Sequence, residues 1–156
     1  MDPLLELGLA VKALQRELER QANEAMRPLG VTGAQADVIS VIGQAGSLSL
    51  KELGELVIAE SGHPSRLVDR LVEAGLVART AAPDDRRRVE LSLTPEGRRL
   101  EKRVAAARAG IIELARAALG DRDLSPALEL AHELLQHTPH AALIERRREL
   151  IDRSSA

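Results

Sequence analysis

The chain has 156 residues, which fits one domain or one domain with an added dimerisation element, and its 44% hydrophobic and 29% charged residues are ordinary for a soluble globular protein. It contains no cysteine, which excludes disulfides, thiolate catalysis and cysteine-bound zinc, and no aromatic residue, which argues against single-strand and RNA binders that stack bases. The net charge of −2 is unevenly spread, because residues 1–60 carry 5 basic and 9 acidic side chains whereas residues 61–103 carry 10 and 7.

The first predicted element is a long amphipathic helix over about residues 3–27, which the segment Pro28-Leu29-Gly30 ends. Its start has acidic residues instead of the basic head and apolar block of a signal peptide. No apolar run in the chain approaches the roughly 18–20 residues that span a bilayer. We therefore expect a cytoplasmic protein. The apolar residues of this helix recur at spacings of three and four and so share a face: Leu4, Leu7, Val11, Leu14 and Leu18.

Three shorter helices are predicted next. Thr32 can cap a helix over about residues 33–44, and the capping-box pattern from Ser49 to Glu52 opens a helix over about residues 50–58. Ser61 caps a fourth helix, over about residues 62–74, which Gly75 ends. The residues expected to face inward are Ala36, Ile39, Val41, Ile42, Leu53, Leu56, Val57, Leu67, Leu71 and Val72.

A β-hairpin and three more helices complete the predicted order. Residues 76–80 and 89–93 are rich in aliphatic residues and flank the turn-forming Pro83-Asp84-Asp85, which predicts two paired strands. Thr94 then caps a long helix. The expected fold class is mainly α with a small β-hairpin, in the order α-α-α-α-β-β-α-α-α. The last three helices are expected over about residues 95–119, 124–137 and 139–152.

The fourth helix and the hairpin together have the form of a DNA reader. The helix has an outward face of Ser65, Arg66, Asp69 and Arg70, and His63 and Ser65 lie near the N-terminal end that usually meets base edges. Arg66 and Arg70 are four residues apart, so they share a face and can reach bases or phosphates in the major groove. The alternative is an ordinary solvated face on which Asp69 neutralises an arginine.

The hairpin tip favours the DNA interpretation. A turn that only has to be soluble does not need three adjacent arginines. Asp85 can brace the turn or an arginine, Arg86 and Arg87 can then project into the minor groove, and Arg88 completes the basic tip. The alternative is a salt-bridged surface turn. The tip reads Asp84-Asp85-Arg86-Arg87-Arg88.

With these motifs identified, the stretch from Ser49 to Leu100 resembles the winged helix-turn-helix of the multiple-antibiotic-resistance regulator (MarR) family of bacterial transcription factors. The matching segments are LKELGELV, RLVDRLVEAGLVART and DDRRRVELSLTPEGRRL. The family's wing signature, Asp-x-Arg, falls on Asp85 and Arg87. The flanking helices fit its dimerisation region, so the resemblance covers nearly the whole chain.

The resemblance implies a homodimer that binds a pseudo-palindrome in double-stranded DNA and usually represses transcription. It also implies that a small molecule can release the DNA from a pocket between the dimer and reader regions. The lack of aromatic residues excludes a stacking-type pocket, and the sequence identifies no ligand-binding residue. The expected organisation is a dimerisation helix at 1–30, a winged reader at 31–100 and C-terminal dimerisation helices at 101–156.

Other classes of function are weighed against this one. His132, His137 and His140 cluster near the C-terminus with Glu133, so a metal-responsive regulator is an alternative, although Pro139 breaks the geometry toward His140 and zinc needs three or four converging ligands. We therefore expect no metal site and no cofactor. A second alternative is a winged domain that binds protein and not DNA.

An enzyme is not expected. His63, Ser65 and Asp69 have the residue types of a catalytic triad, but they lie on one short helix and cannot converge as base, nucleophile and orienting acid. The chain also has no glycine-rich phosphate loop. Arg98 and Arg99, at the start of the long helix, either touch DNA phosphates or are simply exposed.

Overall fold

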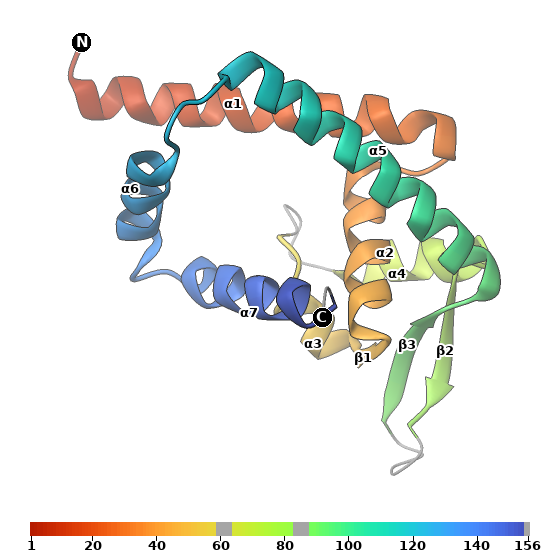
Figure 1. The fold of residues 1–156 in the computed structure, drawn as a ribbon. Helices are drawn as coiled ribbons and strands as arrows, with labels where there is room; N and C mark the ends of the chain where they lie inside the picture. Colours follow the sequence, from red (N-terminus) through yellow and green to blue (C-terminus); the bar gives the residue numbers. More distant parts are fainter. Residues whose placement is uncertain (59–63, 83–87, 155–156) are drawn as a thin grey trace.

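The computed structural model describes residues 1–58, 64–82 and 88–154 (Figure 1). The proposed cap Ser61, the helix residue His63 and the tip residues Asp85, Arg86 and Arg87 lie outside the described residues. In chain order the elements are α1 (Pro3–Met26), η1 (Arg27–Leu29), α2 (Gly33–Ala45), β1 (Ser47–Ser49), α3 (Leu50–Gly54), α4 (Pro64–Glu73), β2 (Val77–Ala81), β3 (Val89–Leu93), α5 (Pro95–Leu119), α6 (Ser125–Leu135) and α7 (Pro139–Ser154).

The predicted helices are confirmed to within a few residues, except that α3 is shorter than expected. The predicted caps Thr32 and Ser49 are confirmed, because their side chains each accept a hydrogen bond from a backbone N–H three residues on. α3 ends at Gly54 and not near residue 58. The N–H groups of Glu55 and Leu56 bond three residues back, and this tightens and ends the last turn.

The sheet has one strand more than the predicted hairpin. β1 pairs antiparallel with the outer edge of β3, with Leu48 opposite Leu91, so the strand order is β1-β3-β2. β1 is only three residues long, and its central Leu48 is its one buried side chain. A segment this short carries no alternation that a sequence pattern could detect, and its partner lies more than 40 residues away.

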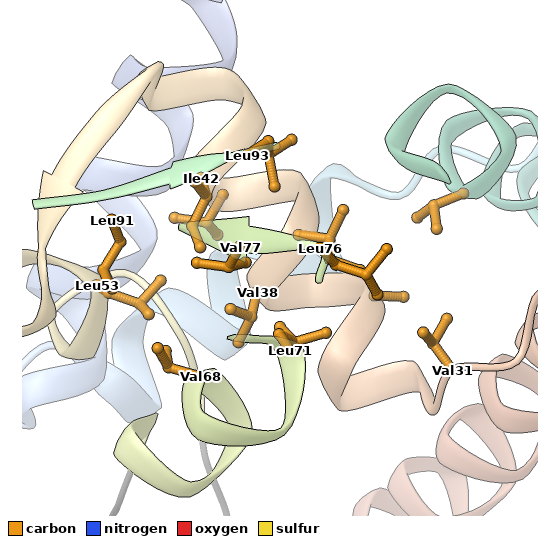
Figure 2. Packing of buried hydrophobic residues seen from close by; sticks show 14 of the residues in the cluster. Val31, Val38, Ile42, Leu53, Val68, Leu71, Leu76, Val77, Leu91 and Leu93 are labelled. Carbon is orange, nitrogen blue, oxygen red and sulfur yellow. The ribbon is translucent and has the colours of Figure 1, made fainter. Parts of the chain in front are cut away.

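The core lies in the region of residues 31–100, called the reader below, and α2 runs through its centre. Figure 2 shows side chains from α2, α3, α4 and the sheet converging on one interior. The predicted inward residues of α2 and α3 are buried or half-buried. On α4 the most buried residue is Val68, which the predicted inward face of Leu67, Leu71 and Val72 had missed. This cluster gives the reader a stable interior against which α4 is fixed.

A close backbone approach fixes the start of α5 against the turn that follows α4. Thr94 caps α5 by accepting from the Gly97 N–H, and its hydroxyl donates to the carbonyl oxygen of Gly75 at 2.7 Å. A Cβ atom on Gly97 would lie 2.0 Å from the Leu76 carbonyl oxygen. Glycine at this position therefore allows the wing and the long helix to meet.

The helices outside the reader are packed differently. α1 has one buried residue, Met26, and α6 and α7 have none among the residues that the structure describes. In Figure 1, α5 leads away from the sheet, α6 turns back, and α7 returns to lie beside α2 and α3. On α1, α5 and α6, the large apolar side chains that are more than half exposed are Leu4, Leu5, Leu9, Val11, Leu14, Leu18, Ile112, Leu114, Leu128 and Leu134. Within the described part of the chain, none of the helices has the length and apolar character needed to cross a membrane.

Candidate nucleic-acid interface

The helix α4 presents a charged outer face. Arg66, Asp69 and Arg70 are exposed, Ser65 is half-buried, and Val68 is fully buried on the opposite side. The predicted division between outward and inward residues is therefore confirmed for this face. Within the described residues, Arg66 and Arg70 have no acidic partner, so their guanidinium groups remain available to a ligand.

An ion pair joins this helix to the wing. Asp69 accepts a hydrogen bond from the Arg79 guanidinium of β2 at 2.5 Å, and both side chains are roughly half exposed. Asp69 does neutralise an arginine, as the solvated-face alternative supposes, but this arginine belongs to β2 and not to α4. The pair therefore links α4 to the hairpin, and among the described residues no acidic side chain pairs with Arg66 or Arg70.

Polar contacts also brace the base of the wing. Below the tip, the Ala82 N–H donates to the Arg88 carbonyl oxygen at 2.8 Å and closes the described part of the hairpin. The exposed Arg88 side chain lies 3.3 Å from Glu90, and the Ser47 hydroxyl donates to the other oxygen of Glu90 at 2.9 Å. These contacts connect β1 to β3 and to the first described residue after the tip.

Arg98 and Arg99, the two proposed phosphate contacts, are exposed and have partners within the chain. Arg98 donates from Nη1 to the Leu93 carbonyl oxygen at 2.7 Å, which ties the end of β3 to the first turn of α5. Arg99 pairs with Glu96 on its own helix. Both arginines therefore contact groups at the start of α5, and their contact with DNA phosphates stays a prediction.

A second polar cluster, absent from the sequence prediction, joins α2 to α5 and α7. Asp37 accepts from the Arg147 guanidinium at 2.8 Å and from Arg108 at 3.2 Å. Arg147 also donates to the Leu56 carbonyl oxygen at 3.1 Å, and the neighbouring Arg146 pairs with Glu55 at 2.5 Å. One signal was present in the sequence: Asp37 is the single charged residue within the predicted helix over residues 33–44.

Hollows lie along α7 where it meets the reader. The first has a volume of about 440 Å³ and a wall that is mainly aliphatic, with charged groups at its edge. A second, of about 420 Å³, lies beside the end of α3. The lining residues of the first are Asp37, Leu56, Ile58, Leu143, Ile144, Arg147, Arg148, Ile151 and Asp152.

The C-terminal histidines lie on or beside different helices. His132 lies on α6, His137 follows it, and His140 lies in the first turn of α7. Throughout the described ranges, no group of three or more histidine, aspartate or glutamate side chains is close enough together to hold a metal ion. The metal-responsive alternative therefore has no geometric support.

Comparison with known proteins identifies the family. The MarR family model matches residues 31–89. The transcriptional repressor MdtR of Bacillus subtilis is 30% identical over 131 residues, which cover 84% of each chain. The multiple antibiotic resistance protein MarR of Escherichia coli is 33% identical over 94 residues, which cover 60% of this chain and 65% of that protein.

Solved structures agree with the sequence comparison. The reduced form of MarR from E. coli matches with a TM-score of 0.62 and 28% identity, covering 83% of this chain and 94% of that one. A cysteine-to-serine mutant of the same protein, crystallised with operator DNA, matches with a TM-score of 0.69 and 26% identity, covering 85% and 94%. Together with the identity to MdtR along most of both chains, these matches show that the chain belongs to the MarR family.

Proposed function

We propose that the protein is a homodimeric transcription regulator, a repressor that binds a pseudo-palindromic operator in double-stranded DNA. The observation that carries this proposal is the exposed arginine face of α4, which has no acidic partner among the described residues and is linked to β2 by the ion pair between Asp69 and Arg79. The name of MdtR, a transcriptional repressor, and the MarR structure with operator DNA support the same function. Since operators lie on the chromosome, we place this activity in the cytoplasm.

In this proposal the reader uses both grooves. Arg66 and Arg70 face the major groove and its flanking phosphates, Ser65 lies in the first turn of α4 nearest the bases, and His63 is a further proposed base contact. The wing inserts into the minor groove, where the negative potential attracts arginine. There Arg86 and Arg87 make the contacts, Asp85 orients them, and Arg88 meets the adjoining backbone.

The exposed apolar faces outside the reader support the homodimer. Leucines on α1 such as Leu14 and Leu18, and Leu114 on α5, are more than half exposed in the single chain. Contiguous apolar surface of this kind usually marks a protein interface. A two-fold axis through these helices would present two copies of α4 to half-sites about 10–10.5 base pairs apart.

For the response to a small molecule, the hollow of about 440 Å³ between α7 and the reader is the candidate site. Its volume lies within the range of roughly 300–1,000 Å³ found for ligand pockets. The aliphatic lining, including Leu143, Ile144 and Ile151, suits an aliphatic effector. A ligand bound in this hollow would move α7 away from α2 and so change the arrangement of the reader helices.

Fluorescence anisotropy on a labelled duplex tests the DNA-binding proposal. The duplex is taken from the region upstream of the protein's own gene, and a scrambled duplex of equal length serves as control. We expect tight, sequence-specific binding that weakens with salt by a log–log slope of about −0.9 for each phosphate contacted. No binding to either duplex at low salt would refute the proposal and would favour a protein-interaction module.

A further inference from the structure

We propose that Arg146 and Arg147 of α7 are positioning residues for DNA recognition, which set the spacing between half-sites that the dimer accepts. This inference depends on the proposed function, since it assumes that two readers bind one operator. It assigns a role to the helix at the C-terminus, which touches the reader but lies on the side away from the wing (Figure 1).

The two arginines hold adjacent points of the reader. Arg146 pairs with Glu55, the C-cap residue of α3, at 2.5 Å. Arg147 donates to the carbonyl oxygen of Leu56, the next residue, and also pairs with Asp37 on α2. Both α2 and α3 pack against α4. A shift of α7 would therefore be passed to the helix that reads the DNA.

Two ion pairs and the hydrogen bond from Arg147 to the Leu56 carbonyl oxygen join α7 to the reader. Hollows of about 440, 420 and 340 Å³ lie along this contact, so apolar packing there is incomplete. Among the α7 residues, Leu150 is the one packed against the reader core. The Arg147 and Asp37 side chains are 20% and 31% exposed, and Coulomb attraction is stronger in such a partly desolvated place than at a surface.

The ion pairs of Arg146 with Glu55 and of Arg147 with Asp37 close a ring of helices. α5 leaves the reader at the wing, α6 packs chiefly against α7, and α7 returns to α2 and α3. Without these ion pairs, the C-terminal helices would be held to the reader by α5 and by the packing of Leu150. If the exposed faces of α1, α5 and α6 form the dimer, the closed ring fixes the distance from the dimer axis to α4.

Asp37 joins three helices, α2, α5 and α7, at one carboxylate. Its carboxylate also accepts from Arg108 of α5 at 3.2 Å, so one acidic group on α2 is shared by two guanidinium groups from the helices before and after α6. This arrangement couples α5 and α7 through the central helix of the reader.

The test is a spacing series with the full-length protein. A half-site obtained by selection from random duplexes is placed twice in labelled DNA, with the spacing varied one base pair at a time around one helical turn. Anisotropy gives the affinity at each spacing. We expect the wild type to prefer its best spacing over one two base pairs longer by about tenfold. Arg147→Gln should reduce this preference to about threefold or less.

The matched control is Arg153→Gln. Arg153 also lies on α7, but its ion pair is with Glu149 on the same helix, at 3.7 Å. This variant should keep the wild-type spacing profile. A second variant, Asp37→Asn, should resemble Arg147→Gln, and the double variant should add little, because both substitutions break one junction.

Each of the following results would contradict the inference. If Arg147→Gln keeps the wild-type spacing preference, or loses affinity equally at every spacing while its melting temperature falls, α7 has no positioning role and the inference is wrong. A wild-type dimer that binds all spacings equally would overturn it as well. Absence of wild-type binding to any selected duplex would instead refute the proposed function itself, and the inference with it.

Discussion

The reader and the helices that flank it differ in how completely their apolar side chains are buried. In the reader, Ile39, Leu53 and Val68 are fully buried, and Gly97 leaves no room for a single added carbon. In the flanking helices, leucines at similar helical spacing, such as Leu14 on α1, are more than half exposed. The same apolar periodicity thus marks a filled interior in one region and an unfilled surface in the other.

This difference shows where a second chain is needed. An element whose apolar face remains in water gains little stability from its own chain, because burial of apolar area is the dominant favourable contribution to folding. The reader can hold its shape alone, whereas α1 and α6 need a partner. The stability of the flanking helices is therefore expected to depend on protein concentration.

The largest effect is expected from removing the first helix. Deleting residues 1–20 takes away the exposed leucines of α1, including Leu4 and Leu14, and should convert the dimer to monomers. Sedimentation velocity measures this directly. A deletion variant that remains dimeric would place the interface on α5 and α6 alone.

A matched pair of glycine substitutions on α5 contrasts the two regions. Gly97→Ala forces a Cβ atom against the Leu76 carbonyl and should destabilise the fold by about 3 kcal/mol, at the upper end of the usual cost of overpacking. Gly110 has no atom within 4 Å of a Cβ position, so Gly110→Ala should stabilise by up to about 1 kcal/mol through helix propensity. Urea unfolding measures both. Equal destabilisation would mean that the outer half of α5 is packed as tightly as the reader.

The wing makes a smaller, DNA-specific contribution. Arg87→Ala should weaken operator binding by about 1–3 kcal/mol if this arginine makes a specific groove contact, without changing the melting temperature. Arg122→Ala, at an exposed position between α5 and α6, is the control for a general loss of charge. Unchanged affinity of the Arg87 variant in an anisotropy titration would remove the wing from the mechanism.

The smallest effect concerns the capping box of α3. Hydrogen bonds from the backbone N–H and then the side chain of Ser49 lower the pKa of Glu52 below its usual 4.5. Because the folded-state pKa is depressed, this group stabilises the fold above about pH 4.5 and loses that contribution as the pH falls through the folded pKa. Glu52→Gln should therefore show slightly less acid sensitivity in thermal melts between pH 3 and 6. Identical pH profiles would show that the carboxylate is not part of the cap in solution.

Local signals predicted much of the fold. The caps at Thr32, Ser49 and Thr94, and the strand β3, appear where the sequence placed them, because capping and alternation depend on neighbouring residues. β1 was missed because it exists only through its pairing with β3. Val68 was missed because one turn of helix does not define which of two adjacent apolar residues faces the core.

The candidate site was predicted less completely. The arginine face of α4 followed from the spacing of Arg66 and Arg70, which is a local property. The partner of Asp69 could not be predicted, because Arg79 approaches it across the turn between helix and strand. Asp37 pairs with Arg108 and Arg147, which lie 71 and 110 positions away along the chain. No local sequence pattern identifies partners at such distances.

The most direct test of the central proposal is sedimentation velocity of the full-length protein with a labelled duplex from the region upstream of its gene. A regulator with two readers should form one complex containing two protomers for each duplex, and added salt should dissociate it. A complex with one protomer for each duplex would contradict the dimeric reader. Free DNA at every protein concentration and low salt would contradict DNA recognition itself.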